Sequence, residues 1–135
     1  MTKVFADSFY WISLINSKDK WHSKARQISE NLSESTLITT DEVLTEVLTY
    51  FSAFGTNMRT FVARIIRDIL NDPNVEVIPQ SHDSFLSGLD LYQQRLDKEY
   101  SLTDCVSMQT MRKLKLTDIL SHDKHFSQEG FQILL

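Results

Sequence analysis

The chain has 135 residues, of which 41% are hydrophobic and 24% are charged, and its formal net charge is −4. This length predicts one domain, residues 1–135, whose hydrophobic core needs no disulfide and no structural metal. The single cysteine, Cys105, excludes an internal disulfide, and the negative charge disfavours binding of nucleic acid through a broad basic surface. It does not disfavour a metal-dependent nuclease, because bound cations reverse the local charge of such a site.

The sequence also predicts the compartment in which the protein works. Its first residues lack the long apolar stretch of a secretory signal. No apolar run approaches the roughly 20 residues that a membrane span needs. A lone cysteine fits a reducing environment. We therefore expect a cytoplasmic protein with no membrane partner.

The first half of the chain predicts two short strands and four helices. Apolar residues at helical spacing define the helices, and short runs rich in β-branched and apolar residues define the strands. Gly55 follows the longest early apolar segment and is interpreted as the C′ residue that ends it. In chain order these elements are strand 3–6, helix 8–15, helix 21–32, strand 36–39, helix 41–54 and helix 57–70.

The last two of these helices predict a helical hairpin with more apolar surface than one face of a sheet needs. Phe51, Phe54, Met58 and Phe61 cluster at its tip. We expect part of this hairpin to be exposed in the monomer and to contact a second copy or another protein. The alternative is that the whole hairpin packs on the sheet.

The second half of the chain predicts three more strands and two more helices. Between residues 81 and 96 we expect a helix with four large side chains pointing inward: Phe85, Leu86, Leu89 and Tyr92. The elements are strand 75–78, helix 81–96, helix 102–114, strand 118–120 and strand 131–135. Strands that alternate with helices predict an α/β sandwich around a mostly parallel sheet, flanked by helices. In such a fold the functional crevice lies outside the carboxyl ends of the strands.

Acidic residues follow or flank several of the predicted strands. Asp7 comes directly after the first strand, where it serves either as a functional carboxylate or as the N-cap of the next helix. Glu46 lies at the margin of an apolar helix face, where an unpaired carboxylate is unfavourable. Glu42 lies further toward solvent, and a capping box between Thr39 and Glu42 explains it well. We therefore favour Glu46 over Glu42 as the functional acid.

Two further acids lie in the last third of the chain. Asp104 opens a helix and forms a possible capping box with Ser101. Ser107 follows one turn later, placed either to bind a phosphate or metal-bound water or simply to pack. Asp123 comes just after the strand 118–120.

Together the four acids Asp7, Glu46, Asp104 and Asp123 are typical of a site for a hard divalent cation such as Mg²⁺ or Mn²⁺. Such a site can activate water and stabilise the in-line transition state of phosphoryl transfer. The four histidines do not form a convincing zinc set, because no cysteine or third histidine has ligand spacing. Three arginines, Arg59, Arg64 and Arg67, are interpreted as a solvated helix face, with contact to RNA phosphates as the less favoured alternative.

The same residues resemble the PIN-domain family, and within it the VapC-like toxins. The resemblance covers essentially the whole chain and rests on four motifs in family order. The first is VFADSFYW with Asp7, and the second is TTDEVLTEVLTYF with Glu46. The third is SLTDCVSMQTM with Asp104 and Ser107. The fourth is ILSHDKHFSQEGF, with Asp123, His125, Phe126 and the terminal Gly130-Phe131 in place.

The resemblance implies a PIN-like three-layer sandwich and a ribonuclease that uses Mg²⁺ or Mn²⁺. It also implies a small cognate antitoxin and a homodimer. Asp123 is the acid that matches the family pattern least well, and Asp118 is the alternative candidate for the fourth acid of the site. Two other functions compete with this one: a PIN-like module that binds RNA or protein without catalysis, and a phospho-acceptor receiver-like domain. The second is disfavoured because Asp7 stands alone after the first strand.

Overall fold

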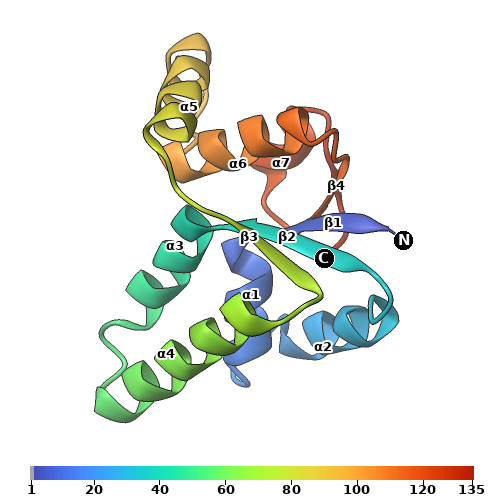
Figure 1. Cartoon of the computed structure of the whole chain (residues 1–135), viewed down its shortest axis with the longest axis vertical. Helices are drawn as coiled ribbons and strands as arrows, with labels where there is room; N and C mark the ends of the chain where they lie inside the picture. The colour runs from blue at the N-terminus through green and yellow to red at the C-terminus, as the bar shows by residue number, and fades with distance from the viewer. Residues whose placement is uncertain (1) are drawn as a thin grey trace.

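A five-stranded sheet forms the middle layer of the structure, a computed structural model that describes residues 2–135 (Figure 1). The strand order is β3-β2-β1-β4-β5, and every neighbouring pair is parallel. The predicted mostly parallel sheet is thus confirmed and is wholly parallel among the described residues. The strands are β1 (Lys3–Ala6), β2 (Thr36–Thr40), β3 (Val75–Ile78), β4 (Asp118–Leu120) and β5 (Gln132–Ile133).

Helices cover both faces of this sheet, which confirms the predicted three-layer α/β sandwich. One layer holds α1 (Ser8–Ile15), α2 (His22–Asn31), α3 (Asp41–Phe51) and α4 (Thr56–Asn71). On the opposite side lie α5 (His82–Gln94), α6 (Leu102–Lys113) and α7 (Lys124–Gln128) (Figure 1). None of the helices in residues 2–135 has the length and apolar character needed to cross a membrane.

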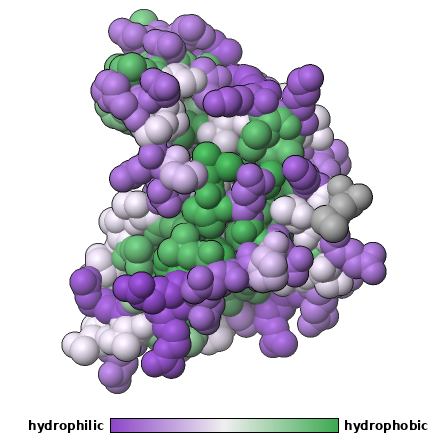
Figure 2. Space-filling model, in the orientation of Figure 1, coloured by the Kyte–Doolittle hydropathy of each residue, from purple (hydrophilic) through white to green (hydrophobic). Residues whose placement is uncertain are grey.

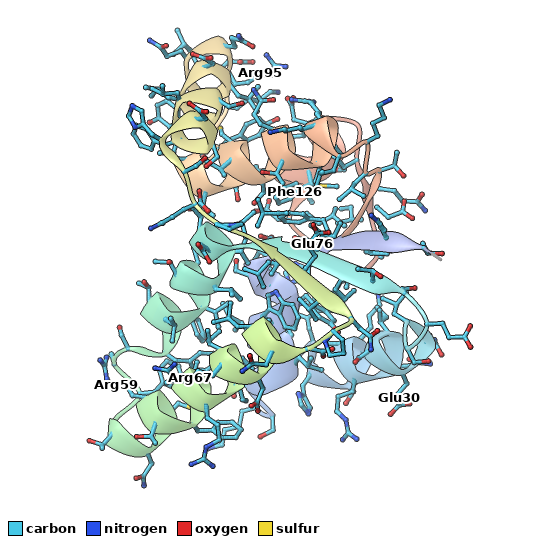
Figure 3. All side chains as sticks on the ribbon, in the orientation of Figure 1. Glu30, Arg59, Arg67, Glu76, Arg95 and Phe126 are labelled. Carbon is cyan, nitrogen blue, oxygen red and sulfur yellow. The ribbon has the colours of Figure 1, made fainter. Side chains whose placement is uncertain are left out.

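The core lies on both sides of β1, at the centre of the sheet. Val4, Phe5 and Ala6 are all buried, so consecutive side chains on opposite faces of this strand meet a helix layer. This pattern is typical of a parallel strand covered on both faces. Tyr10 fills the core on the α1 side, and Phe126 lies between the α6–α7 layer and the sheet (Figure 3).

The turn between α3 and α4 differs from the sequence prediction. Helix α3 ends at Phe51, three residues earlier than predicted, and Phe51 is buried. Gly55 has φ +96° and is the N-cap of α4, so its interpretation as the C′ residue of α3 is wrong. Phe54 and Phe61 are exposed and Met58 is half-buried. The hairpin therefore exposes part of its apolar surface, as predicted, with Phe51 in the core instead of the exposed cluster.

The orientation of α5 contradicts the prediction most clearly. The four residues expected to point inward are all exposed, by 36–50%: Phe85, Leu86, Leu89 and Tyr92. The buried face of α5 is instead formed by Gly88 and Leu91. A Cβ at Gly88 would lie 2.6 Å from Cγ2 of Val106, so only glycine permits this approach to α6. Helix α5 packs on α6 away from the sheet, and a small residue rather than the aromatic face makes the contact (Figure 1).

Strand β3 forms one edge of the sheet. Its apolar residues Val75, Val77 and Ile78 are only half-buried. Figure 2 shows hydrophobic side chains gathered in the middle of this face of the molecule, between the two helix layers. By contrast, Arg59, Arg64 and Arg67 of α4 are all exposed, and Arg59 Nη1 donates to the Ser52 carbonyl at 3.0 Å. This position agrees with their interpretation as a solvated face.

Candidate functional site

The polar residues gather where β1 and β4 end side by side. From β1 the chain continues toward β2 on one side, whereas β4 lies on the other side of β1. Such a switch in strand order opens a crevice outside the carboxyl ends of the strands. Asp7 follows β1 directly, and Ser121 and Asp123 follow β4. The Ser121 hydroxyl donates a hydrogen bond to Asp7 Oδ2 at 3.0 Å and accepts one from the Asp123 backbone N–H at 3.1 Å.

Asp7 is a buried carboxyl group with only 3% of its surface exposed. It occupies the N-cap position of α1, but its side chain makes no capping hydrogen bond, so the simple N-cap interpretation does not describe it. The pKa of Asp7 is raised to about 7, chiefly by burial and also by the charges of the nearby acids Asp104 and Glu46. Hydrogen bonds from Ser8 and Ser121 act in the opposite direction. The metal-free fold therefore disfavours the charged form of this group.

Asp104 joins the crevice from the first turn of α6. The predicted capping box is present: the Asp104 N–H donates to Ser101 Oγ at 3.0 Å, and Asp104 Oδ2 accepts from the Ser101 N–H at 3.3 Å. The same oxygen lies 3.2 Å from His125 Nδ1. Burial raises the pKa of Asp104, and repulsion by Asp123 adds to this, whereas the His125 hydrogen bond lowers it. Capping and a place in the crevice are therefore compatible roles for this residue.

Asp123 and His125 complete a compact group with Asp104. Asp123 is the N-cap of α7, and its Oδ1 accepts from the His125 backbone N–H at 2.9 Å. His125 Nδ1 lies 3.4 Å from the same oxygen. One ligand atom from each of Asp104, Asp123 and His125 lies within 4.8 Å of the other two. Among the described residues this is the group suited to a metal ion, and Asp7 and Glu46 lie outside it.

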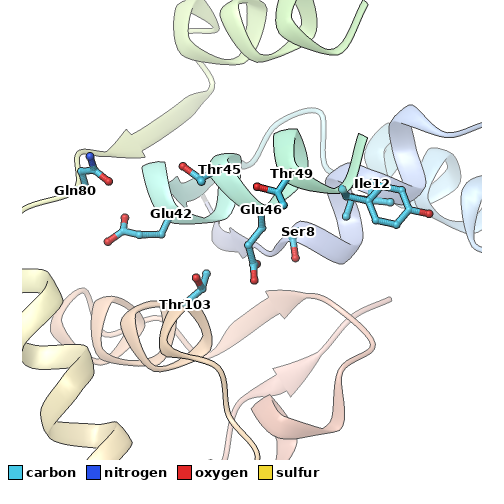
Figure 4. A pocket seen from close by; sticks show the side chains of 9 residues that line it. Ser8, Ile12, Glu42, Thr45, Glu46, Thr49, Gln80 and Thr103 are labelled. Carbon is cyan, nitrogen blue, oxygen red and sulfur yellow. The ribbon is translucent and has the colours of Figure 1, made fainter. Parts of the chain in front are cut away.

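Glu46 projects from α3 toward Ser8 and the start of α6 at Thr103 (Figure 4), where it feels the charges of Asp104 and Asp123. Partial burial raises the pKa of Glu46, and the charges of Asp104 and Asp123 raise it further, whereas the Ser8 hydroxyl lowers it. Glu46 also lines a cavity of about 460 Å³ together with Ser8, Thr45, Tyr50 and Thr103, among others. In Figure 4, Glu46 points toward Ser8 and α6, whereas Glu42 points toward Gln80 at the far end of the cavity.

The predicted capping box between Thr39 and Glu42 is absent, because α3 begins one residue later than that box requires. Thr40 is the N-cap of α3, and its hydroxyl accepts from the Val43 N–H at 3.1 Å. Thr39 is buried in β2 and donates to the Ala6 carbonyl at 2.8 Å, which ties β2 to the end of β1. Glu42 therefore has no capping role and lines the cavity at the end toward Gln80.

Asp118 lies away from the crevice, whereas Ser107 lies within the same helix as Asp104. Asp118 begins β4, so it is at the amino end of the sheet, opposite the end where Asp7 and Asp123 lie. This position makes it a poor substitute for Asp123.

Ser107 is fully buried, and its Oγ has no hydrogen-bond partner among the described residues. A buried hydroxyl without a partner is unfavourable, which fits a group that bonds a water or ligand.

The donor set fits a hard divalent cation. The four predicted acids offer oxygen ligands, which Mg²⁺ and Mn²⁺ prefer. Three of them have a raised pKa, and their mutual repulsion is among the causes. A bound cation would relieve that repulsion. A zinc site is less well supported, because the compact group contains only one histidine and no cysteine.

His125 and Ser121 are the residues that sequence reasoning did not assign to the site. Both lie in the fourth motif, so their proximity in the chain to Asp123 was the available signal. The Tyr100 ring lies 5.1 Å from the His125 ring, and Tyr100 Oη donates to Glu129 at 2.9 Å. Glu129 also binds Arg95 and Arg112, and these contacts, the Arg95 hydrogen bond first, lower its pKa to about 2. This ionic group holds α7, and with it His125, against α6.

Comparison with known proteins adds a structural relative. No family model and no curated protein matches the sequence. The structure is similar to the crystal structure of VapC20 from Mycobacterium tuberculosis, described as a toxin that cleaves the sarcin–ricin loop. The TM-score is 0.82 at 25% sequence identity, and the match covers 97% of this chain and 98% of VapC20.

Proposed function

We propose that this protein is a metal-dependent endoribonuclease, a VapC-like PIN-domain toxin that hydrolyses RNA phosphodiester bonds in the cytoplasm. The observation that carries the proposal is the convergence of Asp7, Glu46, Asp104 and Asp123 on the crevice at the ends of β1 and β4. The full-length likeness to a toxin that cleaves the sarcin–ricin loop supports the choice of RNA as substrate.

The chain's own residues provide a prepared site for the ion and the substrate. Asp7, Glu46, Asp104 and Asp123 would hold Mg²⁺ or Mn²⁺, directly or through water, with His125 and Ser107 beside them. The ion, when bound, supplies a Lewis acid that offsets the negative charge of the phosphodiester. Asp104 and Asp123 are oriented by backbone N–H groups at the starts of α6 and α7, so little rearrangement is needed. Asp7 is oriented by the Ser121 hydroxyl.

The two competing functions are less well supported. The sheet order β3-β2-β1-β4-β5 differs from the 2-1-3-4-5 order of receiver domains. A binding module without catalysis does not need several carboxylates whose charged forms are disfavoured in the same crevice.

A nuclease assay tests the proposal directly. The purified protein is incubated with total cellular RNA in EDTA, and then with Mg²⁺, Mn²⁺ or Zn²⁺ added in excess. We expect discrete cleavage products with Mg²⁺ or Mn²⁺ and none in EDTA. Cleavage that is unaffected by EDTA, or no cleavage with any of the metals, would contradict the proposal.

Glu46 and Glu42 are expected to differ sharply in their effect on activity. Glu46→Gln should lower kcat/KM by roughly 100-fold, because Glu46 faces the acidic group and its charge is needed there. Glu42→Gln removes the same charge at the other end of the cavity and should change kcat/KM by less than about threefold. Steady-state cleavage of one labelled RNA by both variants makes the comparison. Equal losses in the two variants would show that Glu46 has no special role.

A cognate antitoxin and a homodimer are the partners we propose. The exposed apolar residues of the α3–α4 hairpin, Leu48, Phe54 and Phe61, provide a surface for such contacts. Light scattering at tens of micromolar is expected to give the mass of a dimer. The double variant Phe54→Ser/Phe61→Ser should give a monomer with an unchanged far-UV spectrum. A strictly monomeric wild type would count against a homodimer.

A further inference from the structure

Three aromatic side chains stack beside the carboxylates and have no part in the site described above. The His122 ring lies 4.0 Å from the Phe9 ring and 4.5 Å from the Trp21 ring, measured between ring centroids. The His122 and Trp21 rings are nearly parallel, at 26°. Together Phe9, Trp21 and His122 are called the aromatic rim.

The aromatic rim borders the crevice directly. Phe9 is two residues beyond Asp7, and His122 lies between Ser121 and Asp123 in the chain. The hydrogen bonds from Ser121 to Asp7 and from Asp123 to Ser121 place these two segments next to each other. A strand of RNA whose scissile phosphate lies at the carboxylates would therefore pass over or next to the rim.

Two lysines add positive charge at the rim. Lys20 Nζ and Lys24 Nζ lie 5.7 and 5.5 Å from the centroid of the Trp21 ring. Both distances are within the range of a cation–π interaction, so each ammonium group lies beside the Trp21 ring. Both lysines are exposed. In a chain with net charge −4, these two lysines place cations beside an otherwise acidic crevice.

The loop that carries Trp21 is tied to α1. The Trp21 backbone N–H donates to Asp19 Oδ1 at 2.8 Å, and the Ser13 hydroxyl reaches the same oxygen at 3.4 Å. His22 Nδ1 lies 2.8 Å from the Ser13 carbonyl oxygen. These contacts hold the rim in place before any ligand binds, which lowers the ordering needed on binding.

Packing alone gives an incomplete reason for these residues. The ring nitrogens Trp21 Nε1 and His122 Nε2 are buried without a hydrogen-bond partner among the described residues. Burying a polar nitrogen without a hydrogen-bond partner is unfavourable, and apolar side chains would fill the same space without that free-energy cost. Phe9 nevertheless remains 37% exposed. An exposed aromatic side chain with lysines close by is the combination that binds single-stranded nucleic acid, through stacking and phosphate contact.

We propose that the aromatic rim with Lys20 and Lys24 binds the RNA segment next to the scissile phosphate, with a base stacked on Phe9 and phosphates at the two lysines. This inference rests on the proposed ribonuclease function and assigns specific residues to substrate positioning. The rim acts on binding and not on the chemical step, so its loss should raise KM and leave kcat largely unchanged.

The test measures RNA binding and cleavage in matched variants. A fluorescent single-stranded RNA of roughly 12 nucleotides is titrated by anisotropy at several salt concentrations, in an Asp104→Asn background that prevents cleavage. Lys20→Ala/Lys24→Ala is compared with Lys3→Ala/Lys113→Ala, which removes the same two charges at exposed positions away from the rim. Phe9→Leu is measured alongside them, together with thermal melting of every variant and steady-state cleavage by each without the Asp104 change.

In Lys20→Ala/Lys24→Ala, the negative slope of log K for RNA binding against log salt concentration is expected to become shallower by about 1.4. This is the value for the loss of two phosphate contacts to a single strand. Its KM should rise by roughly 10-fold or more, and the control pair should match the parent protein. Phe9→Leu should weaken binding by at least about fivefold, the lower end for loss of a stacked base. Because the lysines are exposed, their replacement tests the inference even if Phe9→Leu lowers stability.

Each outcome separates this inference from the function on which it rests. Cleavage by the wild type combined with parental KM and salt slope in the rim variants would overturn the inference and leave the ribonuclease intact. Binding that depends on the rim without cleavage by the wild type would support the inference and overturn the ribonuclease. No binding of this RNA by the parent protein would overturn the inference. A lower melting temperature in Phe9→Leu with unchanged binding in all variants would show that the rim only packs.

Discussion

Asp104→Asn is expected to abolish Mn²⁺-dependent RNA cleavage and to leave the fold intact. Asp104 belongs to the compact group with Asp123 and His125, so loss of its charge weakens the hold on the cation. Removing several kcal/mol of transition-state stabilisation corresponds to a fall in kcat/KM of roughly 10³-fold. The asparagine oxygen can still accept the Ser101 N–H that the carboxylate now accepts, so the capping box persists. Asp7→Asn is expected to show a similar loss.

The measurement is cleavage of a labelled RNA under single-turnover conditions with excess Mn²⁺. Circular dichroism and melting temperature show whether each variant is folded. Asp90→Asn is the matched control, because it makes the same substitution at an exposed position on α5. Full activity in folded Asp104→Asn would show that this residue only caps α6, and the shared metal site would then be wrong.

Asp7→Asn is expected to stabilise the metal-free protein, and to do so more at pH 8 than at pH 5. The pKa of Asp7 is raised from 3.8 to about 7 in the fold. The native state therefore binds more protons than the unfolded state between about pH 4 and 7, and the free energy of unfolding falls as pH rises through this window. A shift of this size corresponds to about 4 kcal/mol for a buried group. Asparagine carries no charge, so it avoids this loss.

Thermal melting in EDTA at several pH values checks this expectation. The melting temperatures of Asp7→Asn and wild type should differ least near pH 4, more at pH 5, and by roughly 10–15 °C at pH 8. Glu129 adds an opposite slope at lower pH, because its pKa is lowered from 4.5 to about 2 and its contribution is lost as pH falls through that range. The metal-free wild type should thus be most stable near pH 4–5.

Added Mn²⁺ should reverse this dependence on pH. The ion binds the charged carboxylates, so it should stabilise the wild type by mass action, more strongly at pH 8 than at pH 6. The variant should respond much less, whereas Asp90→Asn should behave like the wild type. Lower stability of Asp7→Asn at pH 8 in EDTA, with equal Mn²⁺ shifts in both proteins, would show that Asp7 has a structural role.

The sequence by itself determined the layers of the fold and the acids that line its crevice. Hydrophobic periodicity is a local property, so the strands at Lys3–Ala6 and Val75–Ile78 were predicted with their observed bounds. Parallel strands end at the same edge of a sheet, so acids that follow strands were expected to meet there. The capping box of Ser101 and Asp104 was also local enough to be predicted correctly.

Only the tertiary structure decided which side of an element is buried and which polar groups touch. The apolar face of α5 was predicted to point inward, but the close approach of Gly88 to Val106 turned that face outward. Asp118 and Asp123 are five residues apart in sequence, yet β4 places them at opposite ends of the sheet. The contacts of Ser121 with Asp7 and of His125 with Asp104 join residues 114 and 21 positions apart. Such contacts depend on strand order and helix packing, which no local pattern of residues specifies.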